Sequence, residues 1–113
     1  MKGMTLTKDR ILQILHQELP YLHQHYGVVL IGLYGSFVSG TATDKSDIDL
    51  VVELSRPLGL EFVALADHLE SALGRSVDLI TSETLRLSLD RPRYRPIALR
   101  IQEALTSVQV EAG

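Results

Sequence analysis

The chain has 113 residues, of which 45% are hydrophobic and 22% are charged. This length and balance are typical of one globular domain and exclude a disordered or fibrous chain, so we expect a single domain over residues 1–113. Eleven Lys and Arg residues against fourteen Asp and Glu residues give a net charge of −3, which argues against stable nucleic-acid binding. Without cysteine, the chain has no disulfide, thiolate nucleophile or Cys-ligated metal.

Apolar runs in the sequence are only a few residues long, and Lys2 is not followed by the apolar core of a signal peptide. A membrane-spanning helix needs about 20 predominantly apolar residues. The sequence therefore predicts no membrane association, and we expect a cytoplasmic protein.

The first half of the chain predicts one helix followed by two strands. Apolar residues recur at helical spacing between Thr7, a candidate N-cap, and Gly27, which ends the helix. Pro20 lies inside this segment, so the helix either kinks there or restarts with Pro20 in its first turn. The near-continuous apolar run 28–34 predicts a buried strand, and residues 47–54 predict a second strand with carboxylates at its beginning.

The second half predicts two helices around a short strand. Apolar residues repeat at spacings of three and four over 59–73, and Gly74 is suited to end that helix. Residues 76–81 predict a third strand, Ser82 and Glu83 could open another helical turn, and 96–105 predict a C-terminal helix. Strands that alternate with helices indicate an α/β layer fold.

The segment after the first predicted strand is the most informative part of the sequence. It begins with Gly35 and Ser36, and Gly40 follows four residues after Ser36. A small residue lets a phosphate approach the backbone, and amide groups at the start of a helical turn supply a partial positive charge. The same residues suit a tight strand-to-helix turn, so alone they indicate a phosphate site or only a turn.

Three aspartates give the second signal. Side chains two apart on a strand project to one face, which places Asp47 beside Asp49. Such close carboxylates repel unless a cation compensates, and Mg²⁺ prefers oxygen ligands. Asp78 has the same phase in its strand, so adjacent strands would gather three carboxylates, enough for two Mg²⁺ ions that clamp a transferring phosphate. The alternatives are solvated carboxylates at a strand end and, for Asp78, a capping role.

Together, these residues resemble the motif of the DNA polymerase β-like nucleotidyltransferase superfamily, which is a Gly-Ser pair, an Asp-x-Asp and a distal acid. The segments concerned are Gly35-Ser36 with Gly40, Ser46-Asp47-Ile48-Asp49-Leu50, and Asp78. The short length, the leading helix and the Gly-Leu-Tyr-Gly-Ser entry are most similar to the minimal nucleotidyltransferases (MNT), antitoxins that pair with HEPN-domain toxins. The resemblance covers about residues 11–105. It implies an α/β (α+β) nucleotidyltransferase fold, with a small mixed sheet of three to four strands packed against helices.

The resemblance also implies an activity, which is transfer of AMP from ATP to a tyrosine of a partner HEPN ribonuclease toxin. Two Mg²⁺ ions and ATP would be required. The catalytic and metal-binding residues would be Asp47, Asp49 and Asp78. The nucleotide-binding residues would be Gly35, Ser36, Gly40 and Ser46.

One position departs from the family pattern. Many relatives carry an arginine where this chain has Ser39, and a guanidinium there could contact phosphates. Lys45, Arg56 or an arginine of the basic stretch 91–95 could take its place, although we interpret that stretch as a solvated connector. Two other functions stay open, which are a weakly catalytic module that covers the active site of the toxin and a nucleotidyltransferase for small molecules of the aminoglycoside type.

Overall fold

A four-stranded mixed sheet forms the centre of the computed structural model, which describes residues 6–109; Lys2 lies outside that range. The strand order is β3-β2-β1-β4, with β2 and β3 parallel and β1 antiparallel to both β2 and β4. The strands are β1 (Val28–Tyr34), β2 (Ile48–Leu54), β3 (Val77–Thr81) and β4 (Thr106–Gln109). This confirms the predicted small mixed sheet packed against helices.

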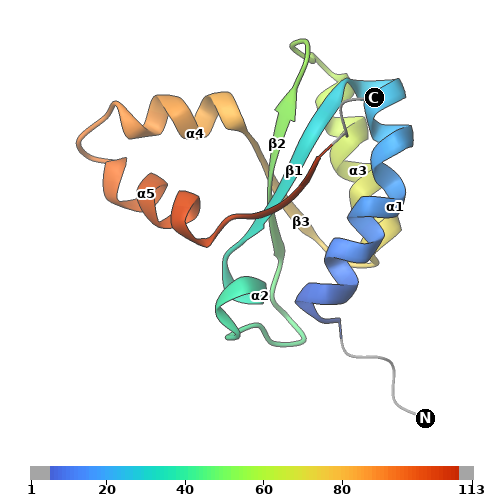
Figure 1. Ribbon diagram of the computed structural model, residues 1–113, viewed down its shortest axis with the longest axis horizontal. Helices are drawn as coiled ribbons and strands as arrows, with labels where there is room; N and C mark the ends of the chain where they lie inside the picture. The colour runs from blue at the N-terminus through green and yellow to red at the C-terminus, as the bar shows by residue number, and fades with distance from the viewer. Residues whose placement is uncertain (1–5, 110–113) are drawn as a thin grey trace.

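Helices cover both faces of the sheet (Figure 1). They are α1 (Lys8–Tyr26), α2 (Ser36–Ser39), α3 (Glu61–Leu73), α4 (Ser82–Leu89) and α5 (Arg95–Ala104). The long helices α1 and α3 pack against one face, whereas α4 and α5 form a hairpin that projects from the other. We call α4, α5 and the connecting residues 90–94 the arm. The short α2 lies at the end of β1, beside the loop that leads into β2.

The helix α1 has the predicted ends. The side chain of Thr7 accepts a hydrogen bond from the amide of Arg10 at 3.1 Å, and Gly27 ends the helix with a φ of 73°. The helix continues through the exposed Pro20 as one element, so the predicted restart does not occur. Leu19 and Leu22, on either side of Pro20, are buried in the core, and this packing stabilises the helix across the missing hydrogen bond.

The hydrophobic core has two parts, one on each face of the sheet. The larger part lies under α1 and α3, and its fully buried members include Ile11, Leu15, Leu22, Ile31, Leu33, Ile48, Leu50, Leu65 and Leu69. The smaller part lies under the arm and consists of Val51, Leu85 and Ala98, with partly buried neighbours that include Tyr34 and Ile80. Because side chains alternate along β2, Asp49 lies on the same face as Val51, the face that the arm covers in part.

Some predicted boundaries were wrong, and one strand was missed. Strand β2 begins at Ile48, so Asp47 precedes the strand instead of opening it, and α4 extends to Leu89 because Leu85 packs into the smaller core. The strand β4 was missed because its four residues alternate polar and apolar side chains too briefly to predict a strand. Leu105 ends α5 and packs over Gly32, where a Cβ atom would lie 2.7 Å from its Cγ. Among residues 6–109, no helix is both long and apolar enough to span a membrane.

Candidate active site

Tyr34, Asp49 and Asp78 form a row across three strands. Tyr34 is the register partner of Asp49 across the antiparallel β1–β2 pair, and Asp78 is its partner across the parallel β2–β3 pair. Adjacent strands are about 4.8 Å apart, so the two carboxylates project side by side from one face. Asp47 lies immediately before β2. The structure thus brings the three predicted aspartates to one end of the parallel pair, and we call them the acidic cluster.

The charges of the acidic cluster act on one another. Burial raises the pKa of Asp49, and the negative charges of Asp78 and then Asp47 raise it further. Burial likewise raises the pKa of Tyr34 to about 12, with added contributions from Asp49 and Asp78. Asp47 and Asp78 are exposed, whereas Asp49 is half-buried. An additional positive charge at this end of the sheet would therefore be stabilised.

Carboxylate oxygens are the donors that Mg²⁺ prefers, so the donor chemistry of the acidic cluster fits this ion. Within the described part of the chain, however, no three His, Cys, Asp or Glu side chains are already gathered as metal ligands. Mutual repulsion keeps like-charged carboxylates apart when no cation lies between them. The structure shows an acidic edge that suits a divalent cation and leaves metal binding as a prediction.

The Gly35–Gly40 turn lies against the acidic cluster. Gly35 has a φ of 82°, and a Cβ atom at this position would collide with the carboxylate of Asp49. Gly40 has a φ of 84° and ends α2, but a Cβ atom there would meet nothing within 4 Å. Glycine is therefore required at position 35 for two reasons, which are the backbone conformation and the close approach of Asp49.

The two predicted serines are placed differently. Ser36 is the first residue of α2, and its carbonyl oxygen accepts hydrogen bonds from the amides of Gly40 and Thr41, both at 3.0 Å. The hydroxyl of Ser46 accepts a hydrogen bond from the amide of Thr43 at 2.8 Å. Ser46 therefore stabilises the loop before β2, and nucleotide binding by either serine stays a prediction.

Arg75 is the arginine that the structure places beside this site, and the sequence analysis missed it. Its guanidinium donates hydrogen bonds to the carbonyl oxygens of Thr43 at 3.0 Å and Ser46 at 3.2 Å. It also lies 5.4 Å from the ring centroid of Phe37, which is buried under the glycine turn. Arg75 thus links α2 to the loop that carries Asp47. No local pattern in the sequence marks this role of Arg75.

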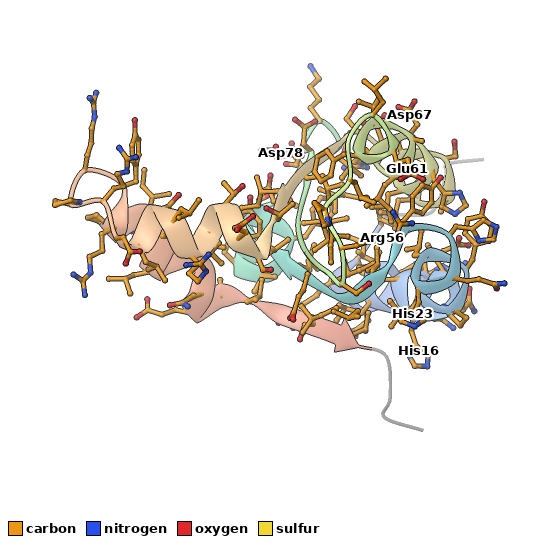
Figure 2. The ribbon with its side chains drawn as sticks, turned by 90° about the horizontal axis from the view of Figure 1, so that it is seen from above. His16, His23, Arg56, Glu61, Asp67 and Asp78 are labelled. Carbon is orange, nitrogen blue, oxygen red and sulfur yellow. The ribbon has the colours of Figure 1, made fainter. Side chains whose placement is uncertain are left out.

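The other basic candidates lie elsewhere, except Lys45. Arg56 contacts Glu61 at 3.2 Å and the carbonyl oxygen of His25 at 3.1 Å, and Figure 2 shows it well separated from Asp78. The arginines of the stretch 91–95 belong to the end of the arm, where residues 90–94 connect α4 to α5 as predicted. Lys45 is exposed in the loop two residues before Asp47 and stays a candidate for phosphate contact.

A hollow of about 620 Å³ lies at the opposite end of β2 and β3. Its lining includes Glu53, Arg56, Phe62, Thr81 and Arg86, but no member of the acidic cluster. Its two arginines are already paired, Arg56 with Glu61 and Arg86 with Glu83. The hollow therefore offers no free cation for a triphosphate and is separate from the acidic edge.

Comparisons with known proteins agree with the fold and the motifs. The profile of the nucleotidyltransferase domain family matches residues 9–102. The chain is 34% identical over 93 residues to the protein adenylyltransferase MntA of Thermococcus cleftensis, an alignment that covers 81% of this chain and 94% of the relative. The fold matches that of a protein assigned to the minimal nucleotidyltransferases, with a TM-score of 0.66, 24% identity and coverage of 92% and 98% of the two chains.

A toxin–antitoxin structure with AMP-PNP is also similar, with a TM-score of 0.52, 25% identity and coverage of 87% of this chain and 88% of that one. The family profile spans most of the chain, and the MntA alignment spans nearly the whole relative. The chain therefore belongs to the nucleotidyltransferase domain family and, within it, to the relatives of the protein adenylyltransferase MntA.

Proposed function

We propose that this nucleotidyltransferase is a Mg²⁺-dependent protein adenylyltransferase that silences a HEPN-domain toxin by transferring AMP from ATP to one of its tyrosines. The observation that carries the proposal is the register of Asp49 with Asp78, beside Asp47 and against the backbone of Gly35. This arrangement combines a carboxylate pair with an adjacent backbone that a phosphate can approach.

Two relatives support ATP as the nucleotide and a toxin protein as the partner. The relative from Thermococcus cleftensis is named a protein adenylyltransferase. The toxin–antitoxin structure at 25% identity contains AMP-PNP, an ATP analogue. Both are similar to this chain over most of their own length, which supports the transfer of these properties to it.

Asp47, Asp49 and Asp78 would hold the Mg²⁺ ions, and the bound ions would neutralise charge on the triphosphate and on the attacking oxygen. Gly35 leaves room for the Asp49 carboxylate, and the hydroxyl of Ser36, the first residue of α2, would donate a hydrogen bond to a phosphate oxygen. Arg75 keeps the loop of Asp47 in position. The main contributions of the chain are therefore positioning and charge compensation.

The reaction is an in-line displacement at the α-phosphate. A bond forms between the tyrosine oxygen and the α-phosphorus, the bond from that phosphorus to the bridging oxygen breaks, and pyrophosphate leaves. The tyrosine proton must be removed as the new bond forms. The carboxylate of Asp78 is exposed at the edge strand β3, so an incoming hydroxyl can reach it, and we assign proton acceptance to Asp78.

Radioactive labelling tests this function. A purified HEPN-domain toxin from the same genome is incubated with Mg²⁺, ATP labelled at the α-phosphate, and the wild-type chain or a variant. We expect labelling by the wild type and by Glu53→Gln, an exposed control on the same face of β2, but not by Asp47→Asn or Asp49→Asn. Undiminished labelling by both aspartate variants would contradict the site.

The same experiment separates catalysis from occlusion. If the Asp47→Asn, Asp49→Asn double variant protects cells from the toxin without labelling it, the protein acts by covering the toxin. Adenylylation requires that protection is lost together with labelling. Intact mass spectrometry of the co-expressed toxin shows whether AMP has been added in the cell.

A further inference from the structure

The arm is basic although the whole chain is acidic. The arm, residues 82–104, contains five arginines and three acids, Glu83, Asp90 and Glu103, so it carries +2 in a chain with a net charge of −3. Arg86 contacts Glu83 at 3.5 Å, and its side chain remains mostly exposed. The other four, Arg91, Arg93, Arg95 and Arg100, have no ion-pair partner among residues 6–109. The arm therefore presents positive charge that the described part of this molecule does not neutralise.

The arm also exposes apolar side chains. Leu87, Tyr94 and Ile97 are 52%, 49% and 58% exposed. Next to them is a hollow of about 90 Å³, roughly the size of one aliphatic side chain, lined by Ile80, Leu85, Ser88, Tyr94, Ile97, Ala98 and Ile101. Tyrosine and arginine beside a small apolar pocket are typical of the residues that contribute most to protein–protein binding.

The end of the arm has a fixed backbone. The amide of Arg91 donates to the carbonyl oxygen of Ser88 at 3.2 Å, and the amides of Tyr94 and Arg95 donate to that of Arg91 at 3.0 and 2.9 Å. The guanidinium of Arg93 lies 5.9 Å from the ring centroid of Tyr94. A surface that is ordered before binding loses little conformational entropy when a partner docks.

The arm and the acidic cluster share one side of the molecule. Leu85 and Ala98 of the arm pack on Val51 in the smaller core, to which Tyr34 and Ile80 also belong. Tyr34 is in turn the register partner of Asp49. Figure 1 shows the arm projecting from the sheet on the side away from α1 and α3. A molecule that rests on the arm therefore lies over the face of the sheet that carries Asp49 and Asp78.

We propose that the arm is the docking surface for the protein that accepts AMP, and that it fits a surface with one apolar side chain surrounded by Asp and Glu. This inference rests on the proposed function and adds the site and chemistry of partner recognition. The exposed apolar side chains and the net charge of −3 favour a protein over RNA. A second copy of this chain is disfavoured, because the basic arm and the acidic remainder are different surfaces, whereas the two-fold dimers that are commonest among homo-oligomers join the same surface of both copies.

The test compares two double charge reversals with the same total change in charge. Arg91→Glu with Arg93→Glu alters the arm, and Lys8→Glu with Arg10→Glu alters exposed positions on α1, on the other face of the sheet. Initial rates of AMP transfer are measured against the concentration of a HEPN-domain toxin from the same genome. We expect the arm variant to raise the KM for the toxin at least about tenfold, with kcat and the KM for ATP within about twofold of wild type. The α1 variant should match the wild type.

A binding measurement separates docking from catalysis. Calorimetric titration of the toxin into Asp49→Asn should give wild-type affinity, whereas Ile97→Ser, which changes no charge, should weaken binding about tenfold or more. An equal KM for the arm variant and the α1 variant would overturn the docking surface and leave the proposed function intact. Binding through the arm without AMP transfer by the wild type would support docking and overturn the proposed function.

Two further outcomes would reassign the arm. If the arm variant loses affinity for a short RNA duplex but not for the toxin, the arginines bind phosphates. If sedimentation shows that the wild type self-associates and the arm variant does not, the occupant is a second copy. Either result overturns the inference that an acceptor protein docks here.

Discussion

Asp49 and Asp78 are register partners on the parallel strands β2 and β3, so two carboxylates project side by side from one face of the sheet. Both burial and the neighbouring charges raise the pKa of Asp49. Such an arrangement is unfavourable for the free protein and becomes favourable when a cation binds. The stability of the protein and its activity should therefore respond in opposite directions to the loss of this carboxylate.

Asp49→Asn should stabilise the protein in the absence of Mg²⁺. Because folding raises the pKa of Asp49 above its usual value of 3.8, the folded state binds the proton more tightly than the unfolded state, and this group lowers stability as the pH rises above that value. At pH 7 we expect the free energy of unfolding to increase by about 0.5–1 kcal/mol, measured by urea denaturation.

Glu53→Gln is the matched control for this change, since Glu53 is exposed on the same face of the same strand. Its free energy of unfolding should differ from that of the wild type by less than about 0.5 kcal/mol. Mg²⁺ with an ATP analogue should raise the denaturation midpoint of the wild type and of Glu53→Gln but not that of Asp49→Asn. An Asp49→Asn protein that is less stable than the wild type without Mg²⁺ would contradict the electrostatic account.

Gly35→Ala should reduce activity far more than Gly40→Ala. Both glycines have a positive φ, but Gly40 is left-handed helical, where a side chain costs about 1–2 kcal/mol, whereas Gly35, with a ψ of −150°, lies in a region that is essentially restricted to glycine and costs up to about 3 kcal/mol. Only at position 35 does the new Cβ collide with the Asp49 carboxylate, and a displacement of about 1 Å in an active site can lower the rate about 100-fold. Rates of AMP transfer at saturating ATP distinguish the two variants, and equal losses would show that the collision with Asp49 does not matter.

Much of the fold followed from local signals in the sequence. Thr7 and Gly27 marked the ends of α1, and the apolar run 28–34 matched β1. The strand β4 was missed because its stability comes from pairing with β1, about 75 residues earlier in the chain, and no local pattern encodes that contact. Helix α4 was predicted too short because Leu85 is stabilised by a distant strand residue, Val51.

Arg75→Met should weaken the loop before β2. The substitution removes two hydrogen bonds to the carbonyl oxygens of Thr43 and Ser46 and the contact with the Phe37 ring. We expect a loss of about 1–3 kcal/mol in the free energy of unfolding and about a tenfold lower rate of AMP transfer. Arg75→Lys should be intermediate because lysine keeps the charge but not the forked geometry.

The control for Arg75 is Arg10→Met, since Arg10 lies on α1 and its guanidinium donates to the exposed side chain of Gln13. It should match the wild type in both measurements. If Arg75→Met also behaves like the wild type, the contacts of Arg75 do not position the site.

The candidate site could be predicted only where its residues lie close together in the sequence. The spacing of Asp47 and Asp49 marked the acidic pair, and the phase of Asp78 became meaningful only once β3 was known to lie beside β2. Arg75 could not be predicted because its partners are backbone carbonyl groups about 30 residues earlier, and any residue type can supply those.

Tyr34→Phe should change the stability of the protein at alkaline pH. Folding raises the pKa of Tyr34 from 10.0 to about 12, so between these values the unfolded chain releases the phenol proton first and stability falls as the pH rises. Phenylalanine has no such proton. The urea denaturation midpoint should therefore fall less between pH 9 and 11 for Tyr34→Phe than for the wild type, and an equal fall would contradict the burial of Tyr34, which is the largest cause of its raised pKa.

Paramagnetic mapping by NMR tests most directly whether the aspartates and the glycine turn bind metal and nucleotide together. Mn²⁺ is added to the ¹⁵N-labelled protein with a non-hydrolysable ATP analogue, and the loss of amide signals is followed along the chain. We predict that the signals of Gly35, Ser36, Asp49 and Asp78 disappear first, and that Asp49→Asn prevents the loss. Selective loss around Glu53 and Arg56, at the opposite end of the sheet, would contradict the site.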